Sequence, residues 1–265
     1  MGLQDDTTPL LITFNEIQNI ERTLSRLDWA RRIVVIDSGS TDGTLEVLAR
    51  DPRIDVHHRA FDGFAQQCNF GLAQVRTNWV LSLDADYELS DEFIAELGRL
   101  QPAAADAGFR AHFVYRIYGR SLRGTLYPPR TVLYRVAEAR YENEGHGHRI
   151  RLSGNVSALK GAIYHDDRKP LARWLASQLK YASIEAAHLL EAEPAELSFA
   201  DRIRRKGWLA PFLVVGYVLF VKRAVFDGRA GWFYAFQRLS AEVLLALELL
   251  DRRLSGQAAG KVGAG

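Results

Sequence analysis

The first hundred residues alternate short apolar runs with helical stripes, and this alternation constrains the fold more than any other feature. The apolar runs predict buried strands at residues 10–14, 32–36, 54–56 and 79–83, and the second of them is rich in β-branched residues. Between them, apolar residues recur at helical spacing, as Ile20, Leu24 and Leu27 do. A β-α-β-α order predicts an α/β fold in which helices flank a mostly parallel central sheet, with ligands at the carboxyl ends of its strands.

The composition is that of an ordinary globular protein. Hydrophobic residues make up 48% and charged residues 25%, which excludes a disordered or collagen-like chain. The 34 basic residues nearly balance the 32 acidic ones, giving a net charge of +2, so we expect no nucleic-acid partner. One cysteine, Cys68, excludes an internal disulfide, and its place on an apolar helical stripe predicts a buried thiol.

The second half of the chain is less regular and then becomes helical. Residues 111–118 and 130–136 predict half-buried strands, while the glycines, prolines and histidines between residues 127 and 148 predict exposed loops over a site. Leucines and alanines recur at helical spacing from Leu171 onward. We therefore expect a catalytic domain over residues 1–168, a helical C-terminal region over 169–255 and a disordered tail over 256–265.

The apolar run Trp208–Val221 (WLAPFLVVGYVLFV) is about 14 residues long, shorter than the roughly 17–25 of a spanning helix. Basic residues lie on both sides of it, at positions 202, 204, 205, 206, 222 and 223. Such a segment is typical of an element lying in the interface of an anionic membrane, and the alternative is a buried core helix. The N-terminal residues carry no secretory signal, so we expect a cytoplasmic protein associated peripherally with the inner face of the membrane.

Two carboxylates, Asp84 and Asp86, directly follow the fourth predicted strand. Carboxylates two residues apart in an extended segment point to the same side, where they can share a cation. Mg²⁺ or Mn²⁺ prefers oxygen ligands and commonly links carboxylates to substrate phosphates. The position predicts a metal site at the sheet edge.

Asp37 ends the second predicted strand and is a second candidate. A carboxylate there can accept hydrogen bonds from a nucleoside base or ribose, while the following Ser40-Thr41-Asp42-Gly43 is interpreted mainly as helix capping. Thr13, Asn15 and Glu16 end the first strand and border the same crevice.

Four segments in succession carry a family resemblance: LLITFNEIQNIERTL, IVVIDSGSTDGT, GFAQQCNFGLA and WVLSLDADYELS. They resemble glycosyltransferase family 2, with its GT-A fold, and within it the bacterial lipopolysaccharide-core β-glucosyltransferases. The similarity is strong over residues 8–100 and looser to about residue 250, where Gly119, His165 and Phe226-Asp227-Gly228 still fit.

The resemblance implies an inverting hexosyltransferase that takes a sugar, usually from UDP, and passes it to a lipid-linked or lipopolysaccharide-core glycan, with Mg²⁺ or Mn²⁺. Matched by position, the residues that contact the donor are Thr13, Asn15, Glu16, Asp37, Asn69, Asp84 and Arg168. The implied metal ligands are Asp86, Asp84 and His165.

The chain departs from the family pattern at two positions. Relatives usually have Arg or Lys directly before the asparagine at position 69, where this chain has Cys68, so Arg130, Arg149, Arg168 or Lys169 is left to contact the diphosphate. Where relatives have a glutamate after the histidine at position 146, this chain has Gly147. An inverting transfer needs a base to deprotonate the acceptor hydroxyl, and the candidates are Glu144, then His146, then Glu142.

Three other functions share parts of this pattern. A polyisoprenyl-phosphate sugar transferase uses the same donor, a nucleotidyltransferase also combines a parallel sheet with carboxylates and Mg²⁺, and a non-catalytic nucleotide-binding membrane adaptor would tolerate the changes at Cys68 and Gly147. The oligomeric state is not indicated by the sequence.

Overall fold

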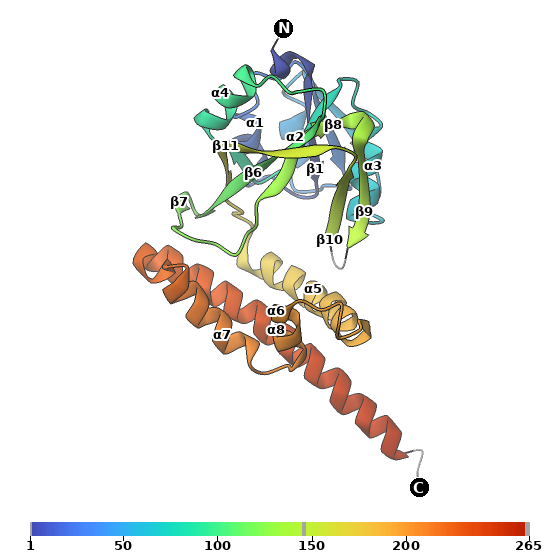
Figure 1. Ribbon diagram of the computed structural model, residues 1–265, viewed down its shortest axis with the longest axis vertical. Helices are drawn as coiled ribbons and strands as arrows, with labels where there is room; N and C mark the ends of the chain where they lie inside the picture. The colour runs from blue at the N-terminus through green and yellow to red at the C-terminus, as the bar shows by residue number, and fades with distance from the viewer. Residues whose placement is uncertain (1, 145–146, 263–265) are drawn as a thin grey trace. The chain divides into compact units, whose positions relative to one another are not determined.

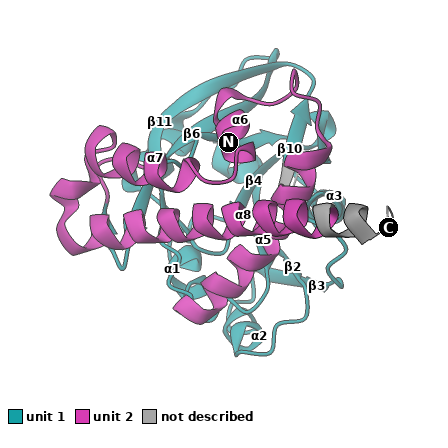
Figure 2. Ribbon diagram, turned by 90° about the horizontal axis from the view of Figure 1, so that it is seen from below, with its two compact units in different colours: residues 1–121, 126–169 teal, residues 122–125, 170–265 magenta. Residues whose placement is uncertain are grey.

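The computed structural model describes residues 2–144 and 147–262 and separates the chain into two compact units (Figures 1 and 2). Unit 1 comprises residues 1–121 and 126–169, and unit 2 comprises residues 122–125 and 170–265.

A central sheet forms unit 1, and four of its strands are parallel neighbours in the order β3-β2-β1-β4. These are β1 (Thr7–Thr13), β2 (Ile33–Asp37), β3 (Ile54–His58) and β4 (Trp79–Asp84). The sheet continues through β8 (Arg130–Arg135), β6 (Asp106–Ile117), β11 (Asn155–His165) and β5 (Tyr87–Leu89), and β7 (Arg120–Ser121) pairs with β6. The predicted parallel β-α-β-α arrangement is confirmed.

Helices cover the sheet of unit 1, and β1 and β2 are almost wholly buried. The helical elements are η1 (Leu3–Asp6), α1 (Ile20–Leu24), α2 (Thr44–Leu48), α3 (Phe64–Leu72), α4 (Asp91–Arg99) and η2 (Val136–Glu138). Helix α4 begins at Ser90, whose hydroxyl accepts a hydrogen bond from the backbone N–H of Phe93. Phe93 packs so closely on β11 that a Cβ at Gly161 would lie 2.3 Å from its Cα, which explains the glycine.

The sheet must curl, and the chain connectivity shows why. Strand β5 starts three residues after β4 ends, yet four strand-to-strand steps separate the two in the sheet order. In a flat sheet those steps would span about 19 Å, whereas the connection reaches only about 10 Å. Curling therefore brings β5 and its partner β11 back to the carboxyl end of β4, where Asp84 and Asp86 lie.

The stretch between residues 127 and 148 is more ordered than the sequence predicts. It contains β8, which confirms the strand predicted at residues 130–136, and the unpredicted strands β9 (Ala139–Glu144) and β10 (Gly147–Leu152), which pair as an antiparallel hairpin. The prediction of exposed loops here was wrong over most of its length, because Tyr141 and Ile150 face each other in the hairpin and pack on α3. Residues 145 and 146 lie outside the described residues.

Unit 2 is helical, as predicted for the C-terminal region. Its elements are α5 (Leu171–Glu191), α6 (Phe199–Arg205), α7 (Ala210–Gly216), η3 (Tyr217–Val221, a π-helical turn), η4 (Ala224–Asp227) and α8 (Gly228–Val262). Alanines of α5 pack against leucines of α8 in a core formed by Ala182, Ala186, Leu189, Leu197, Leu245 and Leu249. Arg204 of α6 forms a salt bridge with the buried Glu242 of α8 at 2.9 Å.

The disordered tail expected at residues 256–265 stays a prediction. Helix α8 continues through residue 256 to Val262, a stretch that includes alanines with high helix propensity, and residues 263–265 lie outside the described part. Among the described residues, none of the helices combines the length and the hydropathy that crossing a bilayer requires.

Candidate active site

Asp37 organises the first of two groups at the carboxyl ends of the strands. Its side chain is fully buried and accepts hydrogen bonds from the Thr13 hydroxyl at 2.9 Å and from the backbone N–H groups of Gly39 and Ser40 at 2.8 Å each. The Ser40 hydroxyl adds a fourth at 2.5 Å. Both carboxylate oxygens are thus filled by donors from the protein itself. We call Asp37, Thr13 and residues 38–43 the Asp37 loop.

Asn15 joins this loop to the end of β1. It has a left-handed backbone conformation with φ of 57°, its N–H donates to the Ser40 hydroxyl at 2.8 Å, and its side-chain oxygen accepts from the N–H of Thr41 at 2.7 Å. Asparagine tolerates this conformation better than most residues. The predicted donor-binding residues Thr13, Asn15 and Asp37 therefore lie together, bound to one another.

A second group gathers around Asp86, in the turn between β4 and β5. Asp86 is 7% exposed, and its Oδ2 lies 3.3 Å from Nε2 of His165 and 3.8 Å from Nζ of Lys169. Lys169 also lies 2.9 Å from Glu16 and 3.4 Å from Asp167. We call these five residues the Asp86 cluster. It unites the predicted Glu16, Asp86 and His165 with Lys169, named beforehand only as a possible diphosphate contact.

Charges in the Asp86 cluster perturb one another strongly. Burial raises the pKa of Glu16 to about 7, against the opposing effect of Lys169. At Asp86 burial acts against the charged form, but His165 and Lys169 outweigh it and hold the pKa below its ordinary range. Burial alone would lower the pKa of His165, yet Asp86 raises it overall. Such mutual perturbation in a strand-end group is typical of a functional site.

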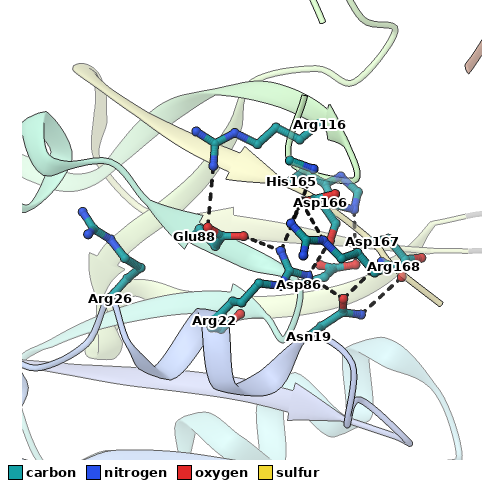
Figure 3. A network of polar contacts seen from close by, with 12 residues as sticks. Asn19, Arg22, Arg26, Asp86, Glu88, Arg116, His165, Asp166, Asp167 and Arg168 are labelled. Atoms are coloured by element: carbon teal, nitrogen blue, oxygen red, sulfur yellow. Dashed lines mark hydrogen bonds and ion pairs between the residues drawn. The ribbon is translucent and has the colours of Figure 1, made fainter. Parts of the chain in front are cut away.

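A polar network positions the segment that carries His165 and Lys169 (Figure 3). Asp166 is fully buried and accepts hydrogen bonds from Arg22 at 3.2 Å, from the N–H of Gly119 at 2.9 Å and from Arg168 at 2.7 Å. Asn19 donates to Glu16 at 3.0 Å and accepts from the N–H of Arg168 at 3.1 Å. Arg168 was predicted to contact the sugar donor, but its guanidinium donates a hydrogen bond to Asp166 within this network.

Sequence reasoning did not single out Asn19 or Arg22. Both lie at the start of α1, where they look like a helix cap and an exposed polar residue, and their partners are more than 140 residues away. No local signal could have identified them, because only the tertiary structure brings residues 165–169 beside α1.

Aromatic rings enclose the other side of His165. The rings of Tyr127 and Tyr115 each lie 4.7 Å from its ring, and that of Tyr87 lies 5.2 Å away, all edge-on. Tyr87 and Tyr127 are joined through their hydroxyls, and Arg130 stacks over Tyr127 at 4.9 Å. These rings exclude water from His165 and strengthen its interaction with Asp86.

Asp84 is placed differently from its predicted partner. Its side chain is 50% exposed and lies 3.9 Å from the Arg130 guanidinium. Only Asp84 belongs to β4, since Ala85 and Asp86 form a turn, so the rule for carboxylates in an extended segment does not apply. In the described part of the chain, no three His, Cys, Asp or Glu side chains form a metal-binding group. The predicted trio of Asp86, Asp84 and His165 is not preassembled.

Asp86 and His165 nevertheless fit a divalent cation. Oδ1 of Asp86 is buried and has no hydrogen-bond partner among the described residues, and Nε2 of His165 faces the same carboxylate. Mg²⁺ commonly takes only one or two protein carboxylates and completes its coordination with water and substrate phosphates. A carboxylate with an unfilled oxygen beside an imidazole matches that requirement.

Asn69 has a structural role that the prediction did not include. Its side-chain amide donates to the carbonyl oxygen of Tyr141 and accepts from the N–H of the same residue, each at 2.9 Å. Asn69 thereby fastens β9 to α3. The predicted thiol burial is confirmed next to it, since Cys68 is buried and burial raises its pKa to about 12.

Two of the three predicted bases, Glu142 and Glu144, lie on β9. Glu142 is exposed and accepts a hydrogen bond from Arg151 at 3.0 Å. The backbone of Glu144 pairs with Gly147, whereas His146 lies outside the described residues. The identity of the base stays a prediction.

A curled α/β sheet with polar groups at its strand ends defines this unit as a GT-A-type domain. The family model "Glycosyl transferase family 2" matches residues 10–166. The chain belongs to glycosyltransferase family 2.

Curated relatives agree in class. A lipopolysaccharide core biosynthesis glycosyltransferase, LpsC of Rhizobium meliloti (strain 1021), is 29% identical over 69% of this chain and 71% of its own length. An uncharacterized glycosyltransferase of Rickettsia bellii (strain RML369-C) is 34% identical, but over 33% of this chain and 30% of its own. The crystal structure of S. aureus TarS 1–349 in complex with UDP-GlcNAc is 14% identical, covers 94% of this chain and 92% of that one, and has a TM-score of 0.49.

Proposed function

We propose that this glycosyltransferase moves a hexose from a nucleotide-diphosphate sugar, first of all a UDP-sugar, to a lipid-linked or lipopolysaccharide-core glycan, with inversion. The observation that carries the proposal is the Asp86 cluster: a buried carboxylate with one unfilled oxygen, between His165 and Lys169 at the end of β4. The similarity to a lipopolysaccharide core biosynthesis glycosyltransferase supports the acceptor class.

In this proposal Asp86 and His165 hold Mg²⁺ or Mn²⁺, which when bound neutralises charge on the departing diphosphate. The ammonium group of Lys169 lies next to Oδ2 of Asp86, the oxygen that also faces His165. It contributes positive charge that stabilises the diphosphate. The backbone of the Asp37 loop forms the part of the site that binds the nucleoside. The Asp37 carboxylate itself is not available to the nucleoside, because it already accepts hydrogen bonds from the protein.

A base on the β9–β10 hairpin accepts the proton of the acceptor hydroxyl as that oxygen attacks the anomeric carbon from the face opposite the diphosphate. Glu144 is our first candidate. Glu142 is the last of the three candidates, because its exposed carboxylate is already paired with Arg151.

The test is a screen of the purified enzyme against nucleotide sugars, with and without Mn²⁺ or Mg²⁺, on a lipopolysaccharide-core acceptor. We expect release of a nucleoside diphosphate and extension of the acceptor. Release of pyrophosphate would instead indicate a nucleotidyltransferase, sugar transfer only to a polyisoprenyl phosphate would change the acceptor class, and no turnover at all would indicate a nucleotide-binding adaptor.

The base is tested separately with Glu144→Gln, His146→Ala and Glu142→Gln. We expect a loss of about 10²–10⁴-fold in kcat for the base and near-normal rates for the other two. Near-normal rates in all three variants would place the base elsewhere.

A further inference from the structure

The segment at residues 208–221 exposes an apolar face, and the alternative that the sequence left open was a buried core helix. Phe212 is 73% exposed and Phe220 is 70% exposed. Leu213, Tyr217 and Val221 are exposed as well, and together these five residues follow the four-residue repeat of one helix face. We call them the α7–η3 face.

The opposite side of the same segment is packed within unit 2. Pro211, Val218 and Leu219 are buried, and α7 runs along α8 (Figure 1). Just beyond the segment, Gly231 of α8 lies directly against the backbone of Ala224 in η4, where a Cβ would lie 1.8 Å from the carbonyl oxygen. The exposed side chains of the α7–η3 face therefore do not belong to the core of unit 2, because other residues of the same segment already fill it. They belong to an element that is apolar on both sides.

Soluble proteins rarely expose several large apolar side chains on one element, and such a patch commonly marks an interaction surface. The surrounding charge indicates the partner. Residues 199–236 contain seven arginines and lysines but only two acidic residues. Both acidic residues are engaged, Asp201 with Arg204 and Asp227 with Arg123, whereas no ion pair is formed by Lys206, Arg223 or Arg229 with any described carboxylate.

We propose that the α7–η3 face docks on an anionic lipid surface, with its phenylalanines at the boundary between headgroups and acyl chains and its basic neighbours on the headgroups. This inference rests on the proposed function, because it identifies the surface that keeps the enzyme beside a lipid-linked acceptor. Apolar burial plus attraction of basic residues is the combination that holds interfacial elements on anionic membranes. Contact is shallow, since the inward side of the segment is occupied by α8.

The experiment is flotation of the full chain with vesicles of phosphatidylcholine alone or mixed with phosphatidylglycerol. We expect binding to the mixed vesicles that weakens with salt and is far weaker without the anionic lipid. The variants Phe212→Ser and Phe220→Ser should each weaken binding about tenfold, and Phe212→Leu and Phe220→Leu should retain it. Lys206→Gln and Arg229→Gln should each weaken it about fivefold.

Matched controls are Leu247→Ser and Leu254→Ser, which remove exposed apolar side chains from the C-terminal half of α8. Neither should change flotation. No flotation of the wild type, or equal losses in the serine variants of both helices, would overturn the proposal. So would self-association of the chain that disappears in Phe212→Ser, because the face would then serve a second copy.

Calorimetric titration with UDP-glucose in the absence of lipid separates this inference from the proposed function. Wild type and face variants should bind the donor alike, with unchanged melting temperatures. Normal flotation without binding of any nucleotide sugar would refute the proposed function and leave the lipid-docking surface standing.

Discussion

The Asp37 loop and the Asp86 cluster both place a buried carboxylate at the carboxyl end of a strand of the same sheet, but they treat its charge in opposite ways. Asp37 accepts hydrogen bonds from four neutral donors of its own loop and of the adjacent strand, and Nδ1 of His58 lies 3.8 Å from its Oδ1. Asp86 faces two ionisable side chains, His165 and Lys169, which come from the last residues of unit 1 in the sequence. One of its carboxylate oxygens has no hydrogen-bond partner among the described residues.

This difference separates a carboxylate that builds the site from one that is available for chemistry. A filled carboxylate holds a loop in one conformation and has little capacity left for a ligand. An unfilled buried oxygen is costly unless something binds it, so such an atom indicates a ligand position. The following variants test this assignment, beginning with the largest expected effect.

Asp86→Asn removes the charge but keeps the shape of the side chain. We expect kcat to fall by about 10³-fold or more, because the site loses the carboxylate that would hold the cation neutralising the departing diphosphate, while the melting temperature changes little. Steady-state kinetics and a thermal melt measure both. Asp91→Asn, at a carboxylate that is 93% exposed, is the control. Activity close to that of wild type would remove Asp86 from the mechanism.

Lys169→Met removes the cation of the Asp86 cluster while keeping the length of the side chain. We expect kcat/KM for the nucleotide sugar to fall about 10²-fold, and binding of UDP to weaken more than binding of uridine. Lys160→Met, on the exposed side of β11, is the control. Equal losses for uridine and UDP would mean that Lys169 supports the fold of the site rather than the diphosphate.

Asp37→Ala should act mainly on stability. It leaves two hydroxyls and two backbone N–H groups without their acceptor, so we expect a loss of about 3 kcal/mol in the free energy of unfolding, or a melting temperature about 6–12 °C lower. The effect on kcat below the melting range should be smaller than that of Asp86→Asn. Denaturant unfolding beside Asp62→Ala, an exposed aspartate, measures it. If Asp37→Ala lowered kcat more than Asp86→Asn, and Asp86→Asn lowered the stability more, the assigned roles of the two carboxylates would be wrong.

The region next to Asp37 is also inaccessible to solvent at Cys68, which packs in the same buried apolar cluster as Ile36. Burial raises its pKa to about 12, so almost no thiolate is present at pH 8. We expect no reaction with a thiol reagent such as DTNB in the folded protein and one equivalent after unfolding in guanidinium. Rapid reaction in the folded state would show that this side of the sheet opens.

Much of unit 1 follows from local sequence. Residues 32–36 and 79–83 became strands because short, mostly apolar runs, β-branched in the case of 33–36, are stable when buried in a sheet. Asp37 and Asp86 were recognised because they directly follow such strands. The β9–β10 hairpin was missed, since its alternating pattern is interrupted by glycines and histidines, and its attachment through Asn69 depends on a partner 72 residues away.

The sequence by itself determined the order of strands and helices, the acidic residues at the strand ends and the apolar run with its basic neighbours, because each depends on the spacing of nearby residues. Only the tertiary structure decided that Lys169 faces Asp86, and that Phe212 and Phe220 face outward while Val218 and Leu219 are buried. The physical reason is that spacing fixes which residues share a face of an element. Which other residues pack on that face depends on contacts between segments that are far apart in the sequence.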